Sequence, residues 1–274
     1  MKKIKLIFLL TIFLAFNNCG YVPLLSNNNY DFSIQDIEIK GDKNLSKLIK
    51  NKGMSTSVGD EGGFAPMISS NNKALDLIVS AIRKSGFVNG KDVCICLDVA
   101  ANELYKNNKY SIHSKKHETV DKSIKEYKKI IKKYKIKSIE DPFAENDWMS
   151  WSKLIKSTNK VQIVGDDLYV TNLERLKKGC LHNSSNAILI KLNQIGTVSE
   201  TLDVIKFAQI IGYKTIISHR SGDSEDTFIA DLAVGTNSNQ IKTGSLARSE
   251  RVSKYNQLIR IEEELGRTAK MHKI

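Results

Sequence analysis

The chain contains few cysteines and few prolines, and both scarcities exclude kinds of protein. Its four cysteines in 274 residues lack the spacing of a disulfide framework, so a small secreted fold built on disulfides is excluded. No combination of cysteine and histidine has the spacing of a zinc site. With only three prolines and no low-complexity stretch, no composition marks a linker between domains. The domain organisation must therefore be inferred from the apolar and charged segments.

Aromatic residues are also scarce, at 7% of the chain, and this matters because the chain is basic. The formal net charge is +12, and much of the excess lies in residues 119–137. A nucleic-acid surface would need aromatic side chains interleaved with basic ones, or a recognisable motif, and neither is present. We interpret the segment as the solvated face of a helix and predict no nucleic-acid partner. A basic nucleic-acid binder is the weaker alternative.

Six short apolar or β-branched runs of strand length each end in a charged or titratable residue. The residues at these ends are Asp98, Glu140, Asp166, Lys191, His219 and Lys242. Most successive ends are separated by about the length of one strand, one helix and two short loops. The first interval is longer and contains YKNNKYSI (residues 105–112), which predicts a β-hairpin.

The segments between these runs have helical periodicity. Residues 73–85 and 119–135 each place their apolar side chains on one face, and five later segments resemble them. Several begin at Ser, Thr or Asp and several end at Gly. Strands that alternate with helices predict parallel pairing and an α/β fold. In a (β/α) barrel the carboxyl ends of the strands meet on one face, so the six strand-end residues should surround one pocket.

Three carboxylates from three successive strands suit a hard divalent cation with oxygen ligands, such as Mg²⁺. The cations Lys191, Arg220 and Lys242 lie at the ends of later strands, and their natural partner is a substrate carrying carboxylate or phosphate. A lysine beside a metal and other cations loses its proton more readily, so it can act as a base. Cys94 and Cys96 are interpreted as small core residues instead of metal ligands.

The pair Asp166 and Asp167 has a simpler interpretation as well. Aspartate is common in turns and at the start of helices, and the segment TNLERL that follows begins like a helix. In the same way, the segment GDEGG could be a glycine-rich turn with a solvated acidic pair. The other strand-end residues favour a shared site over both interpretations.

Several long motifs resemble the enolase family. They are STSVGDEGGFAP, IEDPFAENDW, QIVGDDLYVTN, ILIKLNQIGT, SHRSGDSEDTFIADLAVG and QIKTGSLARSERVSKYNQLIRIEEELG, and they extend from about Met54 to Gly266. The resemblance implies a modified (β/α) barrel, or TIM barrel, preceded in the family by a small N-terminal domain. It implies a lyase of glycolysis that dehydrates 2-phosphoglycerate to phosphoenolpyruvate with Mg²⁺, as a homodimer.

The resemblance also implies roles for residues at matching positions. Asp98, Glu140 and Asp166 match the metal ligands. Lys191 matches the base that removes the C2 proton, and Glu61 matches a carboxylate that helps to expel the C3 hydroxyl.

A second group of matching positions contacts the substrate in the family. These positions are His219, Arg220, Ser221 and Lys242. Asp167 matches no ligand role.

The N-terminal part of the chain departs from the family. Residues 1–18, with a basic start and an apolar run, predict a signal peptide or membrane anchor in which Cys19 is a possible lipid acceptor. Residues 19–50 are interpreted as a short non-enolase segment and seam, and residues 1–45 weakly resemble a lipopolysaccharide-assembly lipoprotein. Residues 51–266 form the enolase-like barrel domain, and residues 267–274 form a tail. The first barrel strands are absent, so we expect an incomplete barrel.

Two hypotheses follow from these features. The first is an enolase-like lyase, impaired because the N-terminal domain and first barrel strands are missing. The alternative is a non-catalytic, envelope-anchored fusion or fragment that carries a remnant barrel. The resemblance implies a cytoplasmic protein, although the family also occurs at the cell surface. The N-terminal segment instead indicates export, with membrane contact only through residues 1–19.

Overall fold

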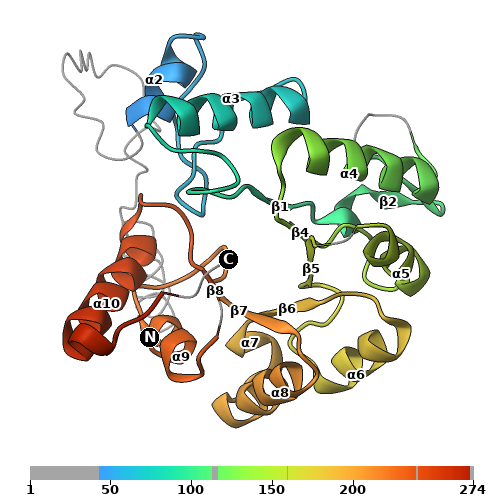
Figure 1. The fold of residues 1–274 in the computed structure, drawn as a ribbon, viewed down its shortest axis with the longest axis vertical. Helices are drawn as coiled ribbons and strands as arrows, with labels where there is room; N and C mark the ends of the chain where they lie inside the picture. The colour runs from blue at the N-terminus through green and yellow to red at the C-terminus, as the bar shows by residue number, and fades with distance from the viewer. Residues whose placement is uncertain (1–42, 113–116, 159, 239, 272–274) are drawn as a thin grey trace, which may run out of the picture. The chain divides into compact units, whose positions relative to one another are not determined.

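The structure is a computed structural model that describes residues 43–112, 117–158, 160–238 and 240–271 (Figure 1). All of these residues belong to one compact unit, Ile39–Ile274. The predicted signal or anchor at residues 1–18 and the possible lipid acceptor Cys19 lie outside the described residues. Among the helices described, none combines the length and apolar character that crossing a membrane requires.

Six parallel strands form the central sheet, in the order β1-β4-β5-β6-β7-β8. Their bounds are β1 Cys96–Asp98, β4 Ser138–Glu140, β5 Gln162–Gly165, β6 Ala187–Ile190, β7 Lys214–Ser218 and β8 Gln240–Lys242. Each strand lies in one of the six predicted runs, so the predicted parallel α/β fold is confirmed. Neighbouring strands in the sheet are also neighbours in the chain, apart from the inserted hairpin, as crossover helices require.

Helices connect the strands and surround them (Figure 1). The α-helices, in chain order, are α2 Lys43–Lys50, α3 Asn71–Lys84, α4 Val120–Tyr134, α5 Trp148–Ser157, α6 Leu173–His182, α7 Leu192–Ile195, α8 Val198–Ile210, α9 Phe228–Gly235 and α10 Ser249–Leu265. Two short 3-10 helices, η1 Ala101–Leu104 and η2 Gly266–Thr268, complete them. Thr119, Asn172 and Thr197 cap α4, α6 and α8 by accepting a backbone N–H, as their residue types favour.

The predicted hairpin is confirmed. β2 (Tyr105–Lys106) pairs antiparallel with β3 (Lys109–Tyr110). Asn107 and Asn108 connect the strands with φ of 51° and 57°, a left-handed conformation that asparagine tolerates better than most residues.

The central strands β5, β6 and β7 are buried on both faces, and this explains their continuous apolar runs. In β5, Ile163 packs in the large core between the sheet and the helices, whereas Val164 belongs to a second cluster. β6 repeats the pattern, with Ile188 in the large core and Leu189 in the second cluster. Successive side chains of a strand point to opposite faces, so the second cluster lies on the concave side of the sheet.

The sheet is curled but open. Gln162 in β5 and Gln240 in β8 exchange two amide hydrogen bonds of 3.0 and 2.9 Å, although these strands are not neighbours in the sheet. Within the described residues, β1 and β8 each have a single strand partner and do not pair with each other. The predicted incomplete barrel is therefore confirmed as a curved, six-stranded part of a barrel.

The interpretation of Cys94 and Cys96 as core residues was wrong for Cys96. Its side chain is exposed, and Cys94 is only half-buried. β1 is an edge strand of the described sheet, so no further strand covers its outer side.

Candidate active site

The six predicted strand-end residues lie at the carboxyl edge of the sheet. Asp98, Glu140 and Lys242 are the last residues of β1, β4 and β8, and Asp166, Lys191 and His219 directly follow β5, β6 and β7. In parallel strands this edge carries residues from every strand, which is why separate segments of the chain meet there.

Lys242 joins two of the carboxylates. Its Nζ donates to Asp98 Oδ2 at 2.7 Å and to Glu140 Oε1 at 2.9 Å. Asp98 and Glu140 are register partners in adjacent strands, so one ammonium group reaches both. The sheet therefore brings a cation of its last strand to carboxylates of its first two.

The charges in this group have opposing effects on pKa values. Burial raises the pKa of Glu140, the attraction of Lys242 lowers it, and repulsion from Asp98 and Asp166 raises it, with a result of about 7. Burial disfavours the charged form of Lys242, but Glu140 and Asp98 outweigh this effect and raise the pKa of its ammonium group.

Asp166 pairs with Lys191. The Nζ of Lys191 donates to Asp166 Oδ2, and Gln194 Nε2 donates to Asp166 Oδ1 at 3.2 Å. Thr171 holds this group in place, because its Oγ1 accepts the backbone N–H of Lys191 at 2.9 Å and donates to Gln194 Oε1 at 2.7 Å. Both oxygens of Asp166 thus face donors at the strand ends.

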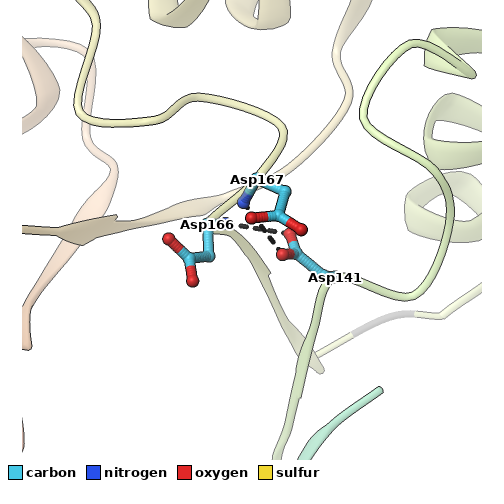
Figure 2. A group of neighbouring side chains, drawn as sticks. All are labelled: Asp141, Asp166 and Asp167. Atoms are coloured by element: carbon cyan, nitrogen blue, oxygen red, sulfur yellow. Dashed lines mark hydrogen bonds between the residues drawn. The ribbon is translucent and has the colours of Figure 1, made fainter. Parts of the chain in front are cut away.

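Asp141 has a different environment. Its two carboxylate oxygens accept the backbone N–H groups of Asp166 and Asp167, each at 2.9 Å. Figure 2 shows this carboxylate facing the backbone of the two residues, with the side chain of Asp166 directed away from it. Burial raises the pKa of Asp141 well above its usual range, and the hydrogen bonds from Asp167 and Asp166 oppose this shift. Asp141 therefore fixes the turn after β5.

Asp167 has a different partner from its neighbour Asp166. Its Oδ2 accepts a hydrogen bond of 2.8 Å from Asn102 Nδ2, so it holds the η1 segment. The two neighbouring side chains thus have separate partners, Asp166 at the strand ends and Asp167 at η1. Turn chemistry explains Asp167 but does not explain the pairing of Asp166 with Lys191.

Glu61 lies on the GDEGG loop, and two glycines bring this loop close to the segment after β8. Gly62 has φ of +77°, and a Cβ there would lie 2.3 Å from the carbonyl oxygen of Ala247. Gly244 has φ of +87°, and its Cβ would lie 2.8 Å from the carbonyl oxygen of Glu61. The backbone N–H of Ser245 donates to that same oxygen at 2.8 Å. Only glycine permits this approach.

His219 is buried beside this loop. Its Nε2 lies 3.5 Å from Glu61 Oε2, and its Nδ1 lies 2.7 Å from Arg251 Nη1. Burial lowers the pKa of His219, Glu61 raises it, and Arg251 and Lys242 lower it further.

Arg220 and Ser221 lie on the exposed loop after β7. The Nη1 of Arg220 donates to Asn193 Oδ1 at 3.3 Å, at the start of α7. Ser221 contributes its backbone carbonyl to Arg251, and its residue is exposed. Among the described residues, neither side chain forms a hydrogen bond or ion pair with Asp98, Glu140 or Asp166, so both lie at the rim of the strand-end group.

Arg251 and Lys254 of α10 were missed by the sequence analysis. Both are almost completely buried, at 0% and 1% exposure. Lys254 Nζ donates to the carbonyl oxygens of Ser224 and Glu250. The signal that could have identified them is their spacing of three, which places both on one face of a helix that otherwise carries many charged residues.

The carboxylates offer two possible metal sites. Asp141, Asp166 and Asp167 have ligand oxygens within 4.8 Å of one another. However, Asp141 already uses both oxygens for backbone N–H groups, and Asp167 accepts from Asn102. Asp98, Glu140 and Asp166 instead accept from ammonium groups, which a hard divalent cation can replace. The donor set at the strand ends therefore fits a metal ion with oxygen ligands.

A part of a (β/α) barrel with carboxylates and lysines at its carboxyl strand ends has the architecture of a barrel enzyme. The model of the enolase C-terminal TIM barrel domain matches residues 38–274. A curated enolase of Pelagibacter ubique (strain HTCC1062) is 72% identical over 295 aligned residues, covering 99% of this chain and 71% of the relative. The chain belongs to the enolase family of lyases. The match starts before Met54 and includes part of the segment interpreted as a seam.

Proposed function

We propose that this chain catalyses the dehydration of 2-phosphoglycerate to phosphoenolpyruvate in the cytoplasm, with Mg²⁺ as cofactor. The observation that carries the proposal is the contact of Lys242 with Asp98 and Glu140 next to the pair of Lys191 and Asp166. Carboxylates for a metal and lysines for an anionic substrate thus lie at neighbouring strand ends. The homodimer that the family implies is part of the same proposal.

Asp98, Glu140 and Asp166 would hold the Mg²⁺. When bound, the metal supplies positive charge that stabilises the substrate carboxylate as that group gains negative charge. Asp141 positions one of these three ligands, because it accepts hydrogen bonds from the backbone N–H groups of residues 166 and 167 and so fixes the backbone of Asp166.

Lys191 is proposed as the base that takes the C2 proton on its Nζ. Its contact with Asp166 places the amine at the edge of the carboxylate group, where the acidic carbon of the substrate would lie. The hydrogen bond from its backbone N–H to Thr171 Oγ1 fixes the start of its side chain. A base must be held in this way because proton transfer requires close and constant geometry.

Glu61 is proposed to protonate the departing C3 hydroxyl. Hydroxide is a poor leaving group, so a positioned acid lowers the barrier to its loss. The side chain of Glu61 is half exposed and lies beside His219, which leaves it accessible to substrate. His219, Arg220, Ser221 and Lys242 are proposed to contact the anionic groups of the substrate.

The predicted impairment of catalysis, the fusion or fragment hypothesis and the domain boundaries stay predictions. The predicted signal or anchor and most of the predicted seam lie in residues 1–42, outside the described residues.

The test is the ultraviolet absorbance of phosphoenolpyruvate formed from 2-phosphoglycerate and Mg²⁺ by the purified full chain. We expect product with Mg²⁺ and none in the presence of a chelator. Replacement of a positioned base typically costs about 10²–10⁴-fold in rate, so Lys191→Ala should lose that much. Lys206→Ala, an exposed lysine of α8, is the matched control and should retain the rate.

Equal rates for the parent and Lys191→Ala would contradict the assigned base. Absence of product from a folded, Mg²⁺-binding chain would instead favour the non-catalytic remnant barrel.

A further inference from the structure

Arg251, in the first turn of α10, is a buried cation outside the groups that the proposed reaction uses. Its side chain is 0% exposed. Burying a guanidinium is costly unless its N–H groups find acceptors and its charge is balanced. Asp223 Oδ2 and Glu250 Oε1, each 3.9 Å from an Arg251 nitrogen, supply the opposite charge.

The two terminal nitrogens of Arg251 use all of their hydrogens. Nη1 contacts His219 Nδ1 at 2.7 Å and the carbonyl oxygen of Arg220 at 2.8 Å. Nη2 contacts the carbonyl oxygens of Asp60 at 3.0 Å and Ser221 at 2.7 Å. Four N–H groups thus meet four acceptors. One guanidinium joins the GDEGG loop to the loop after β7.

The contact between Arg251 and the imidazole determines which ring nitrogen of His219 carries a hydrogen. A guanidinium has five N–H donors and no acceptor, and it stays charged at any ordinary pH. Nδ1 of His219 must therefore be the acceptor and cannot carry the hydrogen. A neutral imidazole has one N–H, so that hydrogen must be on Nε2.

The other side of the ring faces Glu61. Nε2 is buried and has no hydrogen-bond partner, while Glu61 Oε2 lies 3.5 Å away. The charged groups facing the imidazole are Glu61 on its loop, Arg251 on α10, Lys242 on β8 and Asp223 on the loop after β7. Of these, only Arg251 makes a hydrogen bond to a ring nitrogen.

We propose that Arg251 is a positioning residue that holds His219 in the neutral Nε2–H tautomer and so directs an N–H group toward Glu61 and the substrate pocket. The inference about the tautomer does not depend on the proposed reaction. Its consequence for catalysis does, because an Nε2–H group can donate to an anionic substrate or to Glu61, whereas an Nε2 lone pair could not.

The first measurement uses the full chain labelled with ¹⁵N-histidine and no substrate. Long-range ¹H–¹⁵N NMR distinguishes a protonated from an unprotonated ring nitrogen, and the loss of signals in His219→Gln assigns the residue. At neutral pH we expect Nδ1 of His219 without hydrogen and Nε2 with hydrogen. The opposite tautomer in the parent chain overturns the proposal without any further variant.

The second measurement compares three variants. Arg251→Met keeps the length of the side chain but removes the donors, so the His219 signals should change to a mixture of tautomers or to the doubly protonated ring. Arg251→Lys keeps a cation that can only donate, so it should restore the Nε2–H signals. Lys254→Met removes another buried cation of α10 that does not contact His219, so the tautomer should be unchanged.

Retention of the pure Nε2–H tautomer in a folded Arg251→Met chain would overturn the role of Arg251. The same NMR change in Lys254→Met would also overturn it, because the effect would then belong to general loosening of α10. A failure of the phosphoenolpyruvate assay would leave these NMR results unaffected, so the two proposals fail separately.

Discussion

Asp98 and Asp167 are aspartates of the same carboxyl edge, but they have different partners. Asp98, at the end of β1, accepts a hydrogen bond from Lys242 at the end of β8, whereas Asp167 accepts one from Asn102. Asp98 belongs only to the proposed metal site, and Asp167 belongs only to the cluster with Asp141. The two residues therefore distinguish between the two possible metal sites.

We expect Asp98→Asn to remove most of the thermal stabilisation that Mg²⁺ gives the full chain, and Asp167→Asn to retain it. Binding of a ligand to the native state at 100 times its Kd adds about 2.7 kcal/mol, so the effect is measurable as a shift in Tm. Thermal unfolding with and without MgCl₂ measures the difference. Loss of the Mg²⁺ response in Asp167→Asn, with retention in Asp98→Asn, would place the metal at Asp141, Asp166 and Asp167.

The strand-end residues could be predicted because each is a charged group directly after an apolar run. The burial of Arg251 and Lys254 was not predicted, because arginine and lysine are rarely fully buried and their spacing of three indicates a shared helix face but not that this face is buried. Their burial depends on acceptors from loops that precede them in the chain by about 30 residues or far more, such as the carbonyls of Ser221 and Asp60. No local pattern reports such partners.

At the level of elements, the GDEGG loop and the segment after β8 are held together by backbone approach. Gly62 and Gly53 form a natural comparison, because both have positive φ, +77° and +67°. A Cβ at Gly62 would meet the carbonyl of Ala247, whereas a Cβ at Gly53 would meet nothing within 4 Å. Conformational strain is common to both positions, and the steric clash is specific to Gly62.

Gly53→Ala should cost about 1–2 kcal/mol of stability, the usual penalty of a left-handed residue, and leave turnover unchanged. Gly62→Ala should also move Glu61, and a misplacement near 1 Å can cost about 10²-fold in turnover. Urea unfolding and the phosphoenolpyruvate assay measure the two effects. Unchanged turnover in Gly62→Ala would show that the position of Glu61 does not depend on this contact.

Elements with strong periodicity were predictable, and those without it were not. The stripe of Ile124 and Tyr127 predicted α4, and both residues are buried. α7 consists of only four residues, Leu192–Ile195, none of them buried, so it has no amphipathic pattern to detect. Its position follows instead from Gln194, which reaches back to Asp166 and Thr171.

At the level of the whole molecule, Gln162 and Gln240 connect two strands that are not neighbours in the curled sheet. Their reciprocal hydrogen bonds connect β5 to β8 across the concave side, and Gln162 also donates to Ser138 Oγ at 3.0 Å. The sequence could predict six strands and their parallel order. It could not predict the contact between Gln162 and Gln240, because that contact joins residues 78 apart in the chain.

Replacing either glutamine by leucine leaves the other amide partly buried without its partner, which typically costs about 1–3 kcal/mol. Replacing both removes that penalty, so the double variant should be less destabilised than the sum of the single variants. A coupling of about 0.5 kcal/mol or more is typical of residues in direct contact. Urea unfolding of the four proteins measures it, and additive costs would show that the two side chains do not stabilise each other.

The same pair of glutamines determines when the fold can be completed during synthesis. A ribosome releases β1 through β7 before Gln240, so the growing chain can pair these strands but cannot yet close the connection to β5. Joining residues so far apart also carries a large loss of chain entropy, which disfavours its early formation. The link between Gln162 and Gln240 can therefore form only after the last strand emerges, and Lys242 reaches Asp98 and Glu140 at that same late step.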